Sequence, residues 1–351
     1  PVVWEGRVFL AGANAQKREV YCFSASDGKL LWRSAVGGED SPKPEINEET
    51  GHAPATLATD GHRVYAIFPT GDLAAFDMAG RKLWEKNLGL PENTYGHSSS
   101  LATWKDTLVV QYDQGHTADD GKSLMYAFAG ASGQELWKIK RPVMASWASP
   151  IIIEAAGKTQ VITSSVPFVM SHDLSTGAEL WRADVMSGEV APCPVFAGGL
   201  VIVCNDHADL VAIKPDGAGD VTKSHVLWKN PDDLPDIVSP TSDGQYIYMV
   251  TTSGMVSCTD AKTGKVLFSE PIDATFHASP LLVKDRLYLT DTAGVTYVLA
   301  WGPKFEKLGE YRLGASVHAS FAVADGKVFI RARKGGGDGE GPASDFLYCI
   351  R

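Results

Sequence analysis

Histidine side chains recur just before short runs of small residues that have the character of strand starts. His52, His97, His277 and His318 each precede such a run, and Trp147 holds the same place in another. Taking these as one structural position predicts an arc of imidazoles on one face of the protein. Three roles remain open: satisfying backbone groups of neighbouring repeats, donating hydrogen bonds to an anionic or polar ligand, or binding a metal, since imidazole suits Zn, Cu and Fe.

Charged loops flank this predicted face. His116 and His207 lie in loops that could contribute to a ligand site, and Arg331 and Arg333 precede a glycine-rich stretch that could bind an anion. Solvated loops are the alternative for all four. The Asp-rich segment 113–120 invites a Ca²⁺ interpretation, but it lacks the spacing and terminal Glu of an EF-hand loop. No metal ligand set is therefore assigned.

Two cysteines are predicted to face each other across a hairpin. Cys193 and Cys204 are equidistant from a turn centred between Gly198 and Gly199. Opposed residues of an antiparallel pair come within disulfide range at non-hydrogen-bonded positions. Either a disulfide or two buried thiols would satisfy the pattern, and a disulfide would indicate an oxidising compartment.

A repeated motif, small-polar-Gly-x-x-Leu-Trp, supplies the elements that must position these residues. Successive copies end at Trp32, Trp84, Trp137, Trp181, Trp228 and Phe268. The intervals of 52, 53, 44, 47 and 40 residues fit one four-stranded blade per repeat. The glycine step predicts a tight turn between the third and fourth strands, and each large aromatic is predicted to fill space between adjacent blades.

Counting predicted first strands gives eight blades. The sequence therefore predicts an all-β chain folded as a single eight-bladed β-propeller of four-stranded antiparallel blades over residues 1–351. The expected blades cover approximately 1–40, 51–89, 96–142, 146–186, 190–233, 236–273, 276–314 and 317–351. The last blade shows only three strands, so we expect its outer strand to come from upstream of residue 1 and to close the ring, because an open edge favours aggregation.

These repeats resemble the pyrroloquinoline-quinone-like propeller family, which includes quinoprotein alcohol dehydrogenases and the BamB-type assembly lipoprotein. The opening PVVWEGRVFL and the HASP-type blade starts look most like secreted, planctomycete-type members. The dehydrogenase resemblance would imply an oxidoreductase using pyrroloquinoline quinone with Ca²⁺. That cofactor is disfavoured because the chain has no vicinal Cys-Cys pair, no assignable calcium set and no insertions to build the cofactor pocket.

Overall charge and hydropathy limit the classes of partner that the protein is expected to bind. The formal net charge is −10 and no Lys/Arg stripe occurs, which argues against nucleic acid. No apolar run is long enough for a membrane span. We expect a periplasmic or secreted binding or scaffold protein, not an enzyme, with a protein or small polar ligand on the face carrying the histidines. The alternative is an oxidoreductase or other enzyme that uses a cofactor or metal in a His-lined funnel.

Overall fold

The computed structural model describes residues 1–351 except 39–43, 45–49, 336–342 and 351. Nearly all regular structure in the described residues is β-strand, arranged as eight consecutive sheets whose pairs are antiparallel except for that of β16 (Glu179–Asp184) and β20 (Gly219–Asp220). Six are four-stranded, one gains a fifth strand and one has three. The predicted fold class is confirmed: the chain is an all-β eight-bladed β-propeller with mostly four-stranded blades.

The strands fall into two compact units, the first of which spans Val2–Cys193 with Pro215–Ser224. Blade one contains β1 (Val2–Trp4), β2 (Arg7–Ala13), β3 (Arg18–Ser24) and β4 (Leu30–Ala35), and blade two contains β5 (Ala58–Thr59), β6 (Arg63–Ile67), β7 (Asp72–Asp77) and β8 (Lys82–Asn87). Blade three contains β9 (Ala102–Trp104), β10 (Thr107–Tyr112), β11 (Leu124–Ala129) and β12 (Glu135–Lys140), with the 3₁₀ helix η1 (Ala118–Asp120) between β10 and β11. Blade four contains β13 (Ile151–Ala155), β14 (Lys158–Ser164), β15 (Phe168–Asp173) and β16 (Glu179–Asp184), and β20 (Gly219–Asp220) pairs in parallel with β16.

The second unit comprises Pro1, Pro194–Lys214 and His225–Arg351. Blade five contains β17 (Val195–Ala197), β18 (Leu200–Val203), β19 (Leu210–Ile213) and β21 (Val226–Asn230), and blade six contains β22 (Thr241–Ser242), β23 (Tyr246–Val250), β24 (Met255–Asp260) and β25 (Val266–Pro271). Blade seven contains β26 (Leu281–Val283), β27 (Arg286–Thr290), β28 (Val295–Ala300) and β29 (Lys307–Arg312). Blade eight contains β30 (Ala322–Ala324), β31 (Lys327–Lys334) and β32 (Ser344–Ile350).

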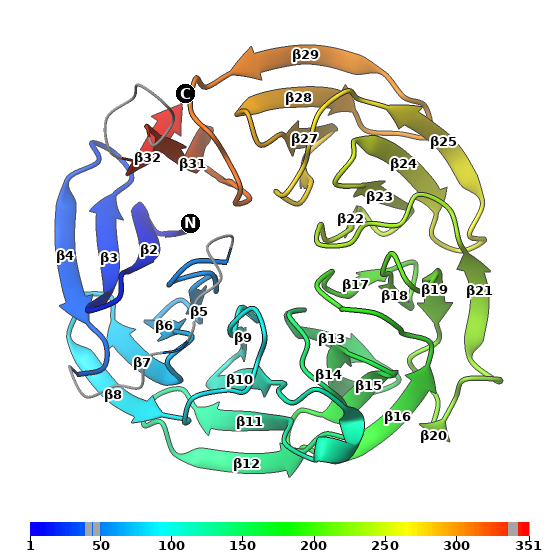
Figure 1. Cartoon of the computed structure of the whole chain (residues 1–351), viewed down its shortest axis with the longest axis horizontal. Helices are drawn as coiled ribbons and strands as arrows, with labels where there is room; N and C mark the ends of the chain where they lie inside the picture. Colours follow the sequence, from blue (N-terminus) through cyan, green and yellow to red (C-terminus); the bar gives the residue numbers. More distant parts are fainter. Residues whose placement is uncertain (39–43, 45–49, 336–342, 351) are drawn as a thin grey trace. The chain divides into compact units, whose positions relative to one another are not determined.

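Burial differs between the middle and the outer strands of a blade. The middle strands β7 and β10 are almost continuously buried, whereas the outer strands β4 and β8 alternate between exposed and half-buried residues. Figure 1 shows β4, β8 and β12 on the outer side of their blades. Hydrophobic side chains of neighbouring blades interlock, as where Tyr65 and Leu73 of blade two pack with Leu108 and Phe128 of blade three. Burial between sheets therefore supplies the core of each unit.

The repeated motif joins each blade to the next through an indole. Trp32 of blade one donates its Nε1–H to the carbonyl of Met78 at 3.1 Å, and its ring lies against Gly80, where a Cβ would come within 2.5 Å of the indole. The same indole–glycine contact joins Trp84 to Gly133, Trp137 to Gly177, and Trp228 to Gly264. The motif needs glycine because any side chain there would displace the tryptophan of the preceding blade.

Two members of the aromatic set depart from this contact. Trp181 is completely buried and donates to both Gln160 Oε1 and the Pro215 carbonyl at 3.2 Å. Phe268 packs edge-on against Phe305, with ring centroids 5.7 Å apart. Both still contact the chain segment that follows their own blade.

Candidate functional site

A chain of hydroxyl groups links the starts of the blades. In the first unit the backbone N–H of Thr56 donates to Ser100 Oγ at 2.9 Å, that of Ser100 to Ser149 Oγ at 2.8 Å, and that of Ser149 to Cys193 Sγ at 3.2 Å. Each of these residues lies two positions before the first strand of its blade. Side chains at this position therefore satisfy a backbone donor of the preceding blade.

The second unit repeats this bond. The N–H of Ser239 donates to Ser279 Oγ and the N–H of Ser279 to Ser320 Oγ, both at 3.0 Å, and all three serines again lie two positions before a first strand. The backbone-satisfying role considered from sequence belongs to these serines. We call the five residues whose side chains accept these bonds, Ser100, Ser149, Cys193, Ser279 and Ser320, the blade-start acceptors.

The blade-start acceptors correct the predicted equivalence of the four histidines. Trp147, His277 and His318 lie two residues before their acceptor, but His97 lies three before Ser100 and His52 four before Thr56. Aligning the histidines to each other hid this offset, because the residue that fixes the register is the hydrogen-bonding Ser or Thr. The histidines do not form one arc of equivalent positions, and each has its own surroundings.

His52 lines a pocket of the first unit. Asn14, Arg18, Pro69 and Thr70 are among the other lining residues. The Arg18 guanidinium is already committed, because its Nε lies 3.0 Å from Asp72 Oδ2 and its Nη2 donates to the Gly38 carbonyl. The pocket can therefore receive a small polar group but does not present an uncompensated positive charge.

His97 is buried, with its ring centroid 4.9 Å from that of Tyr112. Its Nε2 has no hydrogen-bond partner among the described residues. Burial lowers the pKa of His97 to about 4, against a smaller opposing effect of the Asp113 carboxylate. Trp147 packs against Tyr95, with the two ring centroids 5.1 Å apart. Its buried ring N–H also has no hydrogen-bond partner among the described residues.

His277 and His318 are the one predicted pair that the structure brings together. Their Nδ1 atoms are 3.2 Å apart, and the ring planes are inclined by 55°. His277 is half-buried and His318 is exposed. Two imidazole nitrogens thus lie within hydrogen-bonding distance of each other at the surface of the second unit.

The other predicted flanking residues lie at the surface of their loops and strands. His116 Nε2 is 3.5 Å from Glu92 Oε1, and His207 Nε2 is 3.6 Å from Asp206 Oδ2. Arg331 on β31 forms an ion pair with Asp345 on β32, with Nη2 3.2 Å from Oδ2. Arg333 exchanges two backbone hydrogen bonds with Ser316, each 2.9 Å long. The glycine-rich stretch after Arg333 lies mostly outside the described residues.

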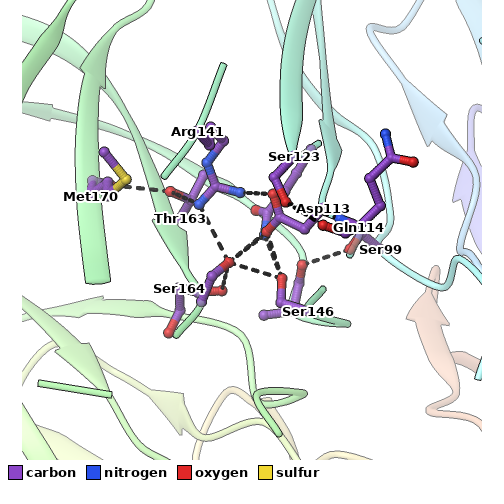
Figure 2. Close-up of polar contacts among 12 residues, drawn as sticks. Ser99, Asp113, Gln114, Ser123, Arg141, Ser146, Thr163, Ser164 and Met170 are labelled. Carbon is purple, nitrogen blue, oxygen red and sulfur yellow. Dashed lines mark hydrogen bonds and ion pairs between the residues drawn. The ribbon is translucent and has the colours of Figure 1, made fainter. Parts of the chain in front are cut away.

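A buried charge network, which sequence reasoning missed, joins blades three and four (Figure 2). Asp113 immediately follows β10, Arg141 immediately follows β12, and Ser165 immediately follows β14. The Asp113 and Arg141 side chains form an ion pair and are both 0% exposed. The ends of three strands therefore converge on one carboxylate inside the protein.

The Asp113 carboxylate is the common acceptor of this network. Its Oδ2 receives hydrogen bonds from Gln111 Nε2 at 2.7 Å, Ser146 Oγ at 2.7 Å and Ser165 Oγ at 2.5 Å. The other oxygen accepts from Arg141, whose second nitrogen donates to Thr163 Oγ1 at 2.8 Å. A buried ion pair persists only when such additional hydrogen bonds replace lost hydration. The only sequence signals were isolated polar residues at strand ends.

The loop over this network is fixed by its own hydrogen bonds. Gly115 donates its N–H to the Glu92 carbonyl at 2.8 Å and accepts from the Ala145 N–H at 3.0 Å. Asp120 Oδ2 accepts from the N–H groups of His116 and Thr117 at 2.7 and 3.1 Å, and these bonds lower the Asp120 pKa. That carboxylate is used to close the loop, and the described residues contain no cluster of three or more potential metal ligands. Residues 116–122, which we call the blade-three loop, are largely exposed on a defined backbone.

The hairpin that was predicted to place Cys193 opposite Cys204 is present in the structure. The register of β17 and β18 pairs residue 195 with 202 and residue 197 with 200, as a turn centred between 198 and 199 requires. Cys204 is buried, and the Cys193 sulfur serves as a blade-start acceptor. The disulfide stays a prediction.

Within the described part of the chain, no helix has the length and apolar character needed to cross a bilayer.

Comparisons with known families match most of the chain. A family model described as "Outer membrane protein assembly factor BamB" matches residues 1–118, 121–228 and 218–301. The chain is 22% identical over 293 residues to the outer membrane protein assembly factor BamB of Yersinia pestis, an alignment covering 81% of this chain and 67% of that protein. It is 23% identical to the tetrathionate hydrolase of Acidithiobacillus ferrooxidans, covering 80% of this chain and 55% of that protein.

Solved structures show the same fold at low sequence identity. BamB from Moraxella catarrhalis is similar with a TM-score of 0.64 and 13% identity, and the match covers 94% of both chains. A quinohemoprotein alcohol dehydrogenase from Comamonas testosteroni has a TM-score of 0.67 and 12% identity, covering 99% of this chain and 73% of that one. An assembly factor and an oxidoreductase thus share this architecture, and the fold does not decide between them.

Proposed function

The chain belongs to the family of the outer membrane protein assembly factor BamB, and from that premise we propose that it is an extracytoplasmic scaffold that docks a protein partner during outer membrane protein assembly. The periplasmic location and the assembly role are taken from the relatives. The finer assignment to secreted, planctomycete-type propellers stays a prediction.

The observation that carries the docking role is the blade-three loop above the buried Asp113–Arg141 network. A loop fixed before binding loses less conformational entropy when it meets a partner than a mobile loop does. Its exposed His116, Asp119 and Lys122 offer both signs of charge and several hydrogen-bonding groups. A protein partner suits this exposed polar loop better than a small ligand, which needs an enclosing pocket.

The alternative is an enzyme with a cofactor or metal near the histidines. The histidines lie at different positions relative to the first strands of their blades, which argues against one site in a funnel shared by all of them. No specific contact in the described residues favours quinone binding, so the oxidoreductase alternative rests on resemblance alone.

Site-specific photo-crosslinking in the native host tests the docking face. A crosslinking amino acid replaces exposed Asp119 of the blade-three loop, and a matched control replaces exposed Lys105 in the β9–β10 turn. The control lies at the opposite end of β10 in the same blade. We expect position 119, and not position 105, to form an adduct with a component of the outer membrane protein assembly machinery. Equal labelling at both positions, or no adduct of that kind, contradicts the proposed face.

Gene deletion tests the biological role separately. We expect the deletion strain to contain less assembled outer membrane protein, measured by quantitative proteomics of isolated outer membranes, and the intact gene to restore it. Unchanged outer membrane composition contradicts the assembly role, whatever the crosslinking result.

A further inference from the structure

The His277–His318 pair has the geometry of two ligands on one ion. Two nitrogens each about 2.0–2.1 Å from a tetrahedral metal ion lie about 3.3 Å apart, because the angle between them is about 109°. The Nδ1 atoms of His277 and His318 are 3.2 Å apart. The separation of the two nitrogens therefore matches that of two imidazole ligands on one tetrahedral ion.

The backbone holds both histidines in place without any metal. The buried residue before each one is anchored: Phe276 N–H donates to the Thr252 carbonyl at 3.0 Å, and Val317 N–H donates to the Thr292 carbonyl at 3.2 Å. Two residues after the histidines, Ser279 N–H donates to Ser320 Oγ at 3.0 Å. These bonds on both sides fix the spacing of blades seven and eight where the imidazoles meet, so little conformational entropy is lost on chelation.

The ring arrangement and the donor set limit what can bind. The centroids are 5.2 Å apart with planes tilted by 55°, so the rings are not stacked on each other. Imidazole nitrogen favours late first-row divalent ions over Mg²⁺ or Ca²⁺, which prefer oxygen. Among the described residues no group of three or more His, Cys, Asp or Glu is placed to hold a metal ion, so the two imidazoles are the only protein ligands that the proposal assigns.

We propose that His277 and His318 chelate one divalent late transition-metal ion, such as Zn²⁺ or Cu²⁺, through their Nδ1 atoms at the surface between blades seven and eight. The site is open to solvent on the side of His318, so the ion can exchange water for a donor from another molecule. The proposal does not depend on the assembly role, because it rests on contacts of the second unit alone.

Calorimetric titration with Zn²⁺ tests the site, using the full chain with Cys349→Ser to remove an exposed thiol. We expect one equivalent to bind, and either His277→Ala or His318→Ala to weaken binding by at least about tenfold, because the second ligand then no longer acts intramolecularly. His116→Ala is the matched control: it removes an exposed histidine elsewhere and should leave the affinity unchanged. Circular dichroism verifies that each variant is folded.

Electron paramagnetic resonance with Cu²⁺ gives an independent readout. We expect coupling to two imidazole nitrogens in the parent protein and to one in each single variant. Absence of a saturable one-equivalent site overturns the proposal and leaves the 3.2 Å contact as a hydrogen bond between imidazoles. Unchanged binding in the double variant overturns it too, because the metal would then lie elsewhere.

Discussion

Removing the Asp113 carboxylate is expected to be among the most damaging single substitutions in the first unit. Asp113→Ala leaves the Arg141 guanidinium, 0% exposed, without its counterion, and it removes the acceptor shared by Gln111, Ser146 and Ser165. Breaking one partner of a buried ion pair costs about 3–5 kcal/mol, since the remaining charge is neither paired nor hydrated. We expect a loss of free energy of unfolding in that range.

Equilibrium unfolding in urea, followed by tryptophan fluorescence, measures this loss as a shift in midpoint at unchanged slope. The double variant Asp113→Ala/Arg141→Met removes both charges together, so it should be less destabilised than Asp113→Ala alone. Glu310→Ala is the control: it breaks the surface ion pairs of Glu310 with Lys307 and Arg312, in which every side chain is at least 30% exposed, and it should destabilise the protein far less than Asp113→Ala.

Two results would refute this reasoning. A loss below about 1 kcal/mol for Asp113→Ala would mean that water or a rearranged partner solvates Arg141, which contradicts a closed network. A double variant as unstable as the sum of the two single variants would mean that the two charges are not energetically coupled.

Three further predictions concern individual contacts. Cys193→Ser should keep stability near that of the parent because it still accepts the Ser149 N–H, whereas Cys193→Ala should cost about 1 kcal/mol in urea unfolding. Gly71→Ala should destabilise far more than Gly89→Ala in thermal melts, because both have positive φ but only at Gly71 would a Cβ lie 2.1 Å from a backbone oxygen, that of Gly89. His97 has a pKa lowered to about 4 by burial, so the unfolded state binds a proton that the folded state does not as pH falls from about 6.5 to 4. Stability should fall over that window, by up to on the order of 3 kcal/mol from this residue, and His97→Gln should flatten the measured decline; an identical decline in the variant would contradict a neutral buried imidazole.

The blade repeat was predictable because both residues of its inter-blade contact, the glycine of one motif copy and the tryptophan of the copy before it, belong to the repeated motif. The glycine and the tryptophan of the motif recur together, and Trp32 against Gly80 shows why neither can change alone. The histidine register was not predictable in the same way. His97 and His277 look alike in sequence, but their places are set by Ser100 and Ser279, and only the hydrogen bonds reveal the offset.

The buried network lay beyond sequence analysis for a different reason. Asp113 and Arg141 lie 28 positions apart, and a loop, a 3₁₀ helix and two strands come between them. Their encounter depends on where β12 ends relative to β10, which no periodicity encodes. From sequence, an isolated Asp beside an Asp-rich loop is expected at the surface. Only its burial in the structure distinguishes Asp113 from the exposed aspartates of the loop.

The indole contacts have a consequence for the order in which the chain can fold during synthesis. Trp32 finds its acceptor at Met78 and Trp84 finds its own at Gly130, so each blade completes a contact only after the next has emerged from the ribosome. A nascent chain therefore carries its most recently made tryptophan uncovered until about one more repeat has been translated. Ribosome pausing within a repeat would prolong that exposure, and chaperone binding to stalled chains should rise and fall with the period of the repeat.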